Sequence, residues 1–268
     1  DFGPEHEGVL RLEGLSAPAE GTLFIRFHCP RTRVAGFCNP IWVKRDPPYR
    51  LYWGDIHTHS RLGKCQQQSY KSPDFGYWFA RDVMALDYAG MADHAWALND
   101  EGWKETIEAA KRHHDPGRFV TFLGFETDYD GPDGGHFNIH YPGYQGDYRN
   151  FRMEKGGTLD AIFEFAREHN GIAISHHNGR RIRGRDYAVS KFGGPDIEPL
   201  VEIYSKWGSS EEWHSHRPIS RGGYPSHTHY FRYAMQQGYR LGVIGGSDDH
   251  NTCPGSYMDM WYPGDGGR

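Results

Sequence analysis

From residue 51 onward the sequence alternates between strand-like runs and helical stretches, and this alternation restricts the possible folds more than any other feature. Helical stretches separate most of the seven runs that have the composition of strands, which are LYWGDIH, YAGMAD, FVTFLGFE, HFNIHY, GIAISH, LVEIYS and LGVIGGSD. Strand–helix–strand units place parallel strands side by side. The pattern therefore predicts an α/β fold with a parallel sheet, either a barrel or a doubly wound sheet.

Two of the helical stretches carry clear start signals. Ser72 is a candidate N-cap followed by Pro73 at the first helical position. Thr158 is a candidate N-cap for a second helix, which should end just before Gly171. The apolar residues of that second helix fall on one face, namely Leu159, Ile162, Phe163 and Ala166. A third helix is expected over residues 226–238.

The first part of the chain has a different character. Residues 1–48 contain short β-like runs broken by Gly and Pro, and no helix signal. The segment RDPPY at residues 45–49 is proline-rich, as expected of a stiff linker to the next domain. We therefore expect a β-rich extension or a remnant of an all-β module at 1–48, and the main domain at 49–268. The chain starts without Met, so we expect a trimmed start; a cytoplasmic location and a periplasmic or secreted one with a lost leader both stay open.

Composition narrows the possible partners. The 268 residues carry a formal net charge of −5, which disfavours nucleic acid as the main partner. No apolar run reaches the roughly 18–20 residues that span a bilayer, so we expect no membrane partner. The four cysteines fit neither a disulfide framework nor a Cys-x-x-Cys zinc site. The oligomeric state stays open.

Ionisable residues concentrate where the predicted strands end. Five of the seven runs end in or next to a His, Asp or Glu, at His57 and His59, at Asp93 and His94, at Glu126, at His176 and His177, and at Asp248, Asp249 and His250, while His136 opens the HFNIHY run. The reactive side chains of α/β barrels gather at the carboxyl ends of the strands. Imidazole and carboxylate ligands suit Zn, Mn or Fe. We therefore expect a metal site there.

The motifs GDIHTHS, MADHA, GFE, GGHFN, SHHNG and GGSDDH, in this order, resemble the polymerase-and-histidinol-phosphatase (PHP) superfamily. The tryptophan before the first motif, the stretch ARDVMALDYAG and the upstream NPI resemble the branch labelled domain of unknown function 3604. The resemblance covers roughly residues 39–250. It implies a distorted (β/α)7 barrel of the PHP type, with a cluster of three metal ions at its carboxyl face and a short N-terminal β-extension.

The resemblance also implies a ligand set, carried over motif by motif. It assigns a first ion to His57, His59 and Asp248, a second to His94 and His250, and a third to His136 with either His176 or His177. Glu126 would bridge the first ion and another. The pattern PHN of the branch favours His177, whereas the pattern SHP elsewhere in the superfamily favours His176.

The sequence departs from this resemblance at one position. Relatives place Asp or His seven or eight residues after the first histidine of the HxH motif, where this chain has Lys64 and Cys65. Three roles stay open for Cys65: a thiolate metal ligand, a disulfide partner of Cys253, or a buried free thiol. We accordingly expect the site to hold two or three divalent ions.

This chemistry points to hydrolysis by a metal-activated hydroxide, and both it and the resemblance favour a small, anionic phosphoester as substrate, whether monoester, diester or triester. The residues expected to act on the substrate are Glu126, Asp248, His250 and, as a phosphate clamp, Arg180 from the segment NGRRIRGR. Asp55, Asp93 and Asp249 are expected to orient histidine rings. The alternatives are a non-catalytic metal-binding or recognition module, and a hydrolase of C–N or C–O bonds.

Overall fold

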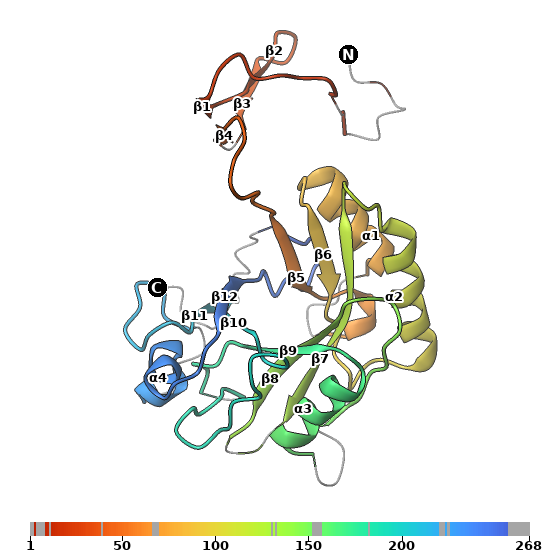
Figure 1. Ribbon diagram of the computed structural model, residues 1–268. Coiled ribbons are helices and arrows are strands. Elements are labelled where there is room, and N and C mark those ends of the chain that lie inside the picture. The colour runs from red at the N-terminus through yellow and green to blue at the C-terminus, as the bar shows by residue number, and fades with distance from the viewer. Residues whose placement is uncertain are drawn as a thin grey trace. The chain divides into compact units, whose positions relative to one another are not determined.

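The structure of the protein is a computed structural model that describes residues 3, 9–10, 12–38, 40–65, 70–129, 131, 133–151, 157–181, 183–219, 223 and 226–256 (Figure 1). Contacts divide the chain into two compact units, Asp1–Tyr52 and Trp53–Arg268. The first unit holds two antiparallel strand pairs, β1 (Gly21–Leu23) with β4 (Ile41–Val43) and β2 (Arg26–Cys29) with β3 (Val34–Phe37). The origin of this unit as an extension or as a module remnant stays a prediction.

In the described part of the second unit, eight strands form one sheet. The strands are β5 (Gly54–Thr58), β6 (Tyr88–Met91), β7 (Val120–Tyr129), β8 (Gly135–Tyr141), β9 (Ile172–His176), β10 (Leu200–Ser205), β11 (Gly208–Ser209) and β12 (Gly242–Gly245). Their order is β11-β10-β9-β8-β7-β6-β5, and β12 pairs with β10. The pairs β5–β6, β6–β7, β9–β10 and β10–β12 are parallel.

The sheet curls until its two ends nearly meet (Figure 1). Just beyond β12, Asp249 forms a parallel bridge with Thr58 at the end of β5. The amide of His59 donates a hydrogen bond of 2.8 Å to the carbonyl of Asp249. These contacts make a nearly closed, distorted barrel and confirm the fold class that the sequence predicts.

One strand runs against the predicted direction. β8 is antiparallel to both of its neighbours, β7 and β9, because the connection from Tyr129 to Gly135 is too short for the crossover that a parallel pair needs. The expectation of a wholly parallel sheet is therefore wrong at this strand. The reversal places the first residues of β8 at the edge where β7 and β9 end, and His136 pairs there with His176.

The helices are α1 (Pro73–Trp78), α2 (Asp100–His113), α3 (Leu159–Glu168) and α4 (Phe231–Gln236). Both predicted N-caps are confirmed, since Ser72 Oγ accepts from the amide of Phe75 at 3.3 Å and Thr158 Oγ1 from that of Ala161 at 3.1 Å. α3 ends at Glu168, slightly before the end predicted at Gly171, and Asn170 lies in the left-handed region with φ of 52°. No helix in the described ranges is long and apolar enough to cross a membrane.

The helix expected over 226–238 is shorter than predicted. A 3₁₀ turn occupies His227–His229, and α4 begins only at Phe231. Its N-cap is Tyr230, whose side chain makes no capping hydrogen bond. Ser226 caps the 3₁₀ turn instead, accepting from the amide of Thr228 at 3.3 Å. Ser226, the first residue of the predicted helix, is therefore an N-cap, but of the 3₁₀ turn and not of α4.

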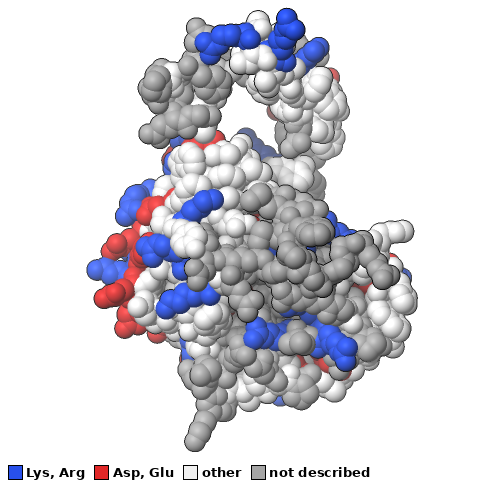
Figure 2. Space-filling model, turned by 180° about the vertical axis from the view of Figure 1, so that it is seen from behind, with Lys and Arg blue, Asp and Glu red and all other residues white. Residues whose placement is uncertain are grey.

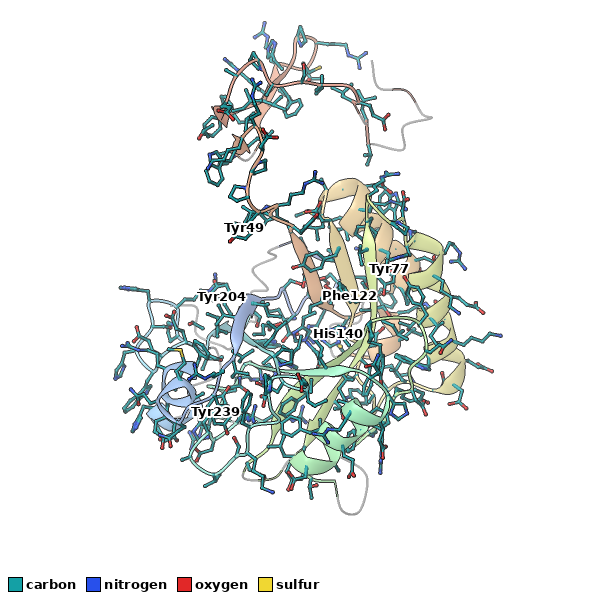
Figure 3. The ribbon with its side chains drawn as sticks, viewed as in Figure 1. Tyr49, Tyr77, Phe122, His140, Tyr204 and Tyr239 are labelled. Carbon is teal, nitrogen blue, oxygen red and sulfur yellow. The ribbon has the colours of Figure 1, made fainter. Side chains whose placement is uncertain are left out.

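The core lies between the sheet and the helices. Buried residues of β7 and β8 meet those of α3, among them Phe125, Phe137, Ile139, Ile162 and Phe163. Burying one such side chain contributes about 1.5–3 kcal/mol. On the α1 side, Tyr77 is fully buried and donates its hydroxyl to the carbonyl of Phe122 at 3.0 Å (Figure 3). The core therefore fixes the strands whose ends carry the ionisable residues.

Charged side chains lie on the outside of the helices. Acidic and basic groups lie next to one another on the face seen in Figure 2. On α2, Lys104 and Glu108 form an ion pair at 3.8 Å, and Arg112 pairs with Asp74 of α1. Such exposed pairs contribute little to stability.

Candidate metal centre

The structure brings the predicted ligands into one cluster at a single edge of the sheet. The parallel strands contribute the residues at their carboxyl ends, and antiparallel β8 contributes one at its start, so that the cluster holds His57, His59, His94, Glu126, His136, His176, His177, Asp248 and His250. All are buried except His94 and His250, whose side chains are 15% and 12% exposed. The strand-end pattern therefore located the cluster.

Glu126, at the end portion of β7, lies at its centre. One carboxylate oxygen, Oε1, contacts His136 and lies 3.3 Å from His176 Nε2. The other oxygen faces three more rings and lies 3.1 Å from His94 Nδ1, 3.3 Å from His59 Nε2 and 3.7 Å from His57 Nε2. A carboxylate with histidines on both of its oxygens has the arrangement of a bridging ligand.

Asp248 follows β12 and faces the same histidines from the opposite direction. Its Oδ1 lies 3.4 Å from His59 Nε2 and 3.7 Å from His57 Nε2. The backbone of Asp248 has φ of 50°, in the left-handed region that most side chains avoid. Strain of this kind is tolerated where the surroundings hold a residue in place for a functional reason.

These side chains form four overlapping groups whose donor atoms lie within 4.8 Å of one another. The groups are Glu126/His136/His176/His177, His59/His94/His250, His57/His59/Glu126 and His57/His176/Asp248. Among the described residues, the buried atoms His57 Nε2, His59 Nε2 and His176 Nδ1 have no hydrogen-bond partner. Buried polar atoms are rarely left unpaired. Converging imidazole nitrogens and carboxylate oxygens therefore fit divalent metal ions.

Neighbouring side chains in the cluster shift the pKa values of its two carboxylates. Burial opposes the charged form of Glu126, yet His94, His136 and His176 together hold its pKa well below the usual range. Burial likewise opposes ionisation of Asp248, and His57 leads the neighbours that lower its pKa. Both carboxylates are therefore ionised at neutral pH, which is the form that binds a cation.

Glu202 in β10 is a part of the site that the sequence did not reveal. Its buried carboxylate accepts a hydrogen bond from His57 Nδ1 at 2.9 Å. This bond turns His57 Nε2 towards Glu126 and Asp248. A Cβ at Gly246 would lie 2.2 Å from Glu202 Oε2, so glycine makes room for the carboxylate. The sequence signal was a lone acidic residue inside the apolar run LVEIYS.

The three aspartates expected to orient histidine rings have another role. Asp55 accepts hydrogen bonds from the amides of His57, Ser247 and Gly255. Asp93 accepts from the amide and hydroxyl of Ser60, and Asp249 accepts from the amides of Asn251 and Cys253. The expectation is wrong in this detail, because these carboxylates fix the loops that carry the rings.

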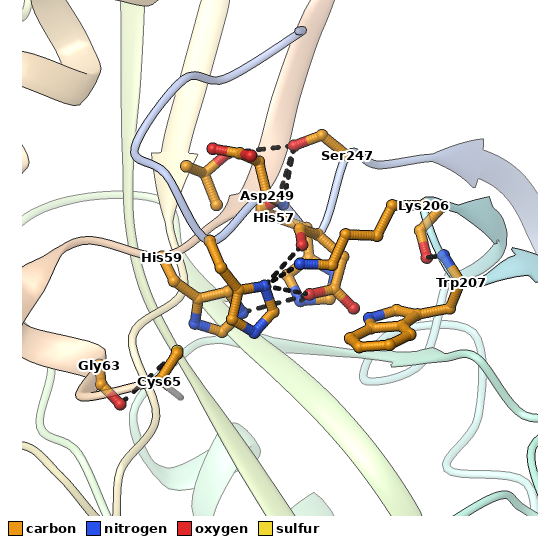
Figure 4. A network of polar contacts seen from close by, with 12 residues as sticks. His57, His59, Gly63, Cys65, Lys206, Trp207, Ser247 and Asp249 are labelled. Carbon is orange, nitrogen blue, oxygen red and sulfur yellow. Dashed lines mark hydrogen bonds and ion pairs between the residues drawn. The ribbon is translucent and has the colours of Figure 1, made fainter. Parts of the chain in front are cut away.

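Cys65 lies at the His59/His94/His250 group. Figure 4 shows its side chain near His59. Burial raises the pKa of the thiol, but hydrogen-bonding contacts with His250 and His94 outweigh it and lower the pKa overall. Both Cys65 and Cys253 are free thiols, so the disulfide alternative is wrong. The structure leaves Cys65 as a ligand or a buried thiol beside two imidazoles.

The two adjacent histidines at the end of β9 and just after it occupy different surroundings. His176 lies between Glu126 and Asp248, whereas His177 accepts a hydrogen bond from Arg180 Nη1 to its Nε2 at 3.3 Å. Burial, with His176 and Arg180, lowers the pKa of His177 well below its usual range. Arg180 therefore reaches the cluster. Arg185, by contrast, is fully buried in an ion pair with Glu198.

Lys206 is a second residue that the sequence did not single out. It directly follows β10, and its Nζ contacts His250 Nδ1, which also lies 2.9 Å from the carbonyl oxygen of Asp248 (Figure 4). The neighbouring Trp207 supports it, with Lys206 Nζ 4.9 Å from the centre of the indole ring. The run LVEIYS, which has no His, Asp or Glu at its end, is thus followed by a lysine.

No family model matches the chain. Over 212 residues the chain is 24% identical to an uncharacterized protein of Chlamydia pneumoniae, a match that covers 78% of this chain and 33% of that protein. The chain thus spans about a third of the length of this curated relative. Among solved structures, the chain is similar to a provisionally named metal-dependent phosphoesterase of Bifidobacterium adolescentis, with a TM-score of 0.45 and 15% identity over 74% of this chain and 88% of that one.

Proposed function

We propose that this protein is a metal-dependent phosphoester hydrolase that holds two or three divalent ions. The observation that carries the proposal is the position of Glu126, which has histidines on both carboxylate oxygens within a buried cluster. The order of the motifs that supply these residues supports placement in the PHP superfamily, in the branch of domain of unknown function 3604. A small anionic phosphoester is the proposed substrate.

The proposed ligands fall into three neighbouring sets. His57, His59 and Asp248 would hold one ion, His94 and His250 would hold a second with Cys65 as a further donor, and His136 and His176 would hold a third. Glu126 links the sets, because its two oxygens face different histidines. His177, bonded to Arg180, is the alternative to His176.

When bound, divalent ions lower the pKa of a water towards about 7 and stabilise the attacking and leaving oxygens of a displacement at phosphorus. The chain's own residues position the reaction. Glu202 holds the ring of His57, and Asp55 and Asp249 hold the loops at the ends of β5 and β12. Arg180, at the rim of the cluster, binds a phosphoryl oxygen of the substrate.

Metal analysis and a substrate panel test this function together. The wild-type chain should bind two or three Zn, Mn or Fe ions and hydrolyse at least one chromogenic phosphomonoester, diester or triester. His57→Ala and Asp248→Ala should each lose metal and activity together. An exposed control, Lys104→Ala, should change neither, because Lys104 lies on the outer face of α2.

The same panel separates the alternatives. Hydrolysis of a lactone or an amide, with no phosphoester turnover, would identify a C–O or C–N hydrolase. Bound metal without turnover of any substrate would indicate a recognition module. Full turnover in metal-free His57→Ala would reject the metal centre.

A further inference from the structure

Lys206 is fixed at the edge of the cluster by its backbone as well as by its side chain. Its amide donates to the carbonyl of Ser247 at 3.2 Å, which ties the end of β10 to the loop that carries Asp248. Its Nζ contacts His250 Nδ1. The side chain is half-buried. The side-chain nitrogen is therefore held next to one of the proposed metal ligands.

Carboxylates of the cluster attract this ammonium, namely Asp248, Asp249 and Glu126. Within the described ranges none of them forms an ion pair with Lys206 Nζ, whose close polar partner is a histidine ring. A cation that is partly withdrawn from water is stabilised by a nearby anion. Bound divalent ions would add further positive charge beside it. An ammonium that is held in this position can therefore pair with an anionic group of a substrate.

Trp207 links Lys206 to a second cation. The guanidinium carbon of Arg180 lies 4.7 Å from the centre of the indole, and Lys206 Nζ lies 4.9 Å from the same centre. Cation–π contact of this kind stabilises both charges. Lys206 reaches the cluster at His250, and Arg180 reaches it at His177. The two cations thus share one aromatic support and approach the cluster at two different histidines.

We propose that Lys206 and Arg180, both packed on Trp207, bind the phosphoryl oxygens of a dianionic substrate, so that the enzyme prefers phosphomonoesters to diesters and triesters. The inference rests on the proposed phosphoester hydrolysis and names its substrate class. A monoester offers more unesterified oxygens, and more charge, than a diester, whereas a triester is neutral. Of the three ester classes, the dianion offers the most charge and the most free oxygens to the metal ions, the ammonium and the guanidinium.

The test compares wild type, Lys206→Gln and Arg180→Gln, with Lys104→Gln as the matched control on an exposed lysine of α2. The three substrates are p-nitrophenyl phosphate, bis(p-nitrophenyl) phosphate and a neutral p-nitrophenyl triester. Metal content is measured for every variant. Binding of inorganic phosphate to the metal-loaded proteins is measured by calorimetry, which needs no turnover.

We expect Lys206→Gln and Arg180→Gln each to lower kcat/KM for the monoester about 10- to 100-fold, as the loss of a charge-assisted hydrogen bond does. Rates with the neutral triester and metal content should stay close to wild type, and phosphate binding should weaken. Equal losses on all three substrates, loss of metal, or unchanged phosphate binding would overturn the inference. A wild type that hydrolyses no phosphoester rejects the proposed function instead, and phosphate binding still decides the role of the two cations.

Discussion

The carboxylate of Glu202 accepts a hydrogen bond from Nδ1 of His57 at 2.9 Å, across 145 residues of sequence. Both groups are buried, and the bond determines which nitrogen of the ring faces Glu126 and Asp248. Partners of this kind raise the basicity of a metal-binding histidine and hold its ring.

Glu202→Gln should therefore weaken metal binding about 10- to 100-fold while the protein still folds. The amide keeps the shape of the side chain but loses its charge. A competition titration against a chromophoric chelator measures the change. Glu105→Gln is the matched control, since Glu105 pairs with Arg61 near the surface. Equal affinities in Glu202→Gln and wild type would show that His57 does not depend on this bond.

Substitutions at Cys65 separate a ligand from a buried thiol. If the thiolate binds metal, Cys65→Ser should lower zinc retention, and Cys65→Asp should restore binding with a preference shifted towards Mn or Fe, because oxygen ligands are harder. Metal analysis after growth in defined media measures both effects. Cys253→Ser is the control, because Cys253 contacts Lys71 and no ring of the cluster among the described residues. Unchanged metal content and preference in Cys65→Ser would exclude the ligand role.

His140 should make the metal-free protein sensitive to acid. It is buried in β8, its ring packs on Gly124, and burial lowers its pKa to about 3 (Figure 3). Since its pKa is about 6.5 in the unfolded chain, the unfolded state gains a proton first as pH falls, and stability is lost at about 1.4 kcal/mol per pH unit below that value.

His140→Phe removes this titration, so between pH 7 and pH 5 it should lose about 2 kcal/mol less stability than wild type. Urea unfolding in the presence of a chelator measures the free energy of unfolding at both pH values. The histidines proposed as ligands are present in both proteins, and their contributions cancel in the comparison. Parallel losses in the two proteins would mean that His140 is protonated in the folded state.

The buried pair Arg185–Glu198 should behave differently from exposed pairs. Arg185→Met leaves the carboxylate of Glu198 buried without its cation and should cost about 3–5 kcal/mol. The double change Arg185→Met with Glu198→Leu should recover most of that loss. Denaturant unfolding measures both. Arg232→Met, which breaks the exposed pair with Glu212, should cost less than about 1 kcal/mol. A double variant no more stable than the single one would contradict this account.

The sequence predicted the barrel and the position of the cluster because both depend on local patterns. Alternating strands and helices determine which ends of the strands share an edge, and His57 and His59 lie at such an end, whereas Glu126 lies three residues before the end of β7. The turn between β7 and β8 was also visible as a short connection, but its consequence for strand direction was missed. His136 was named through the family resemblance, and the antiparallel direction of β8 explains why the first residues of that strand lie in the cluster.

Glu202 and Lys206 could not be found in this way. Glu202 lies inside the run LVEIYS, and Lys206 directly follows it. No His or Asp stands at the end of this run. Their importance comes from contacts across the barrel, to His57 and His250, which depend on the curvature of the sheet. Curvature is a property of the whole sheet, and a single strand's sequence does not encode it.

The bridge between Thr58 and Asp249 has a consequence for the order of folding. It joins the first and the last strand of the barrel, so nearly the whole domain must be in place before it forms, and contacts of such long sequence separation form slowly. We call this junction of β5 with the segment after β12 the seam. The proposed ligands beside it, His57 and His59 on one side and Asp248 and His250 on the other, lie near opposite ends of the domain's sequence. Metal that binds only the closed seam stabilises the native state by mass action, by about 2.7 kcal/mol at a free concentration one hundred times the Kd. A chelator should therefore first release the seam, and hydrogen exchange should rise at β5 and β12 before it rises at β7 and β8.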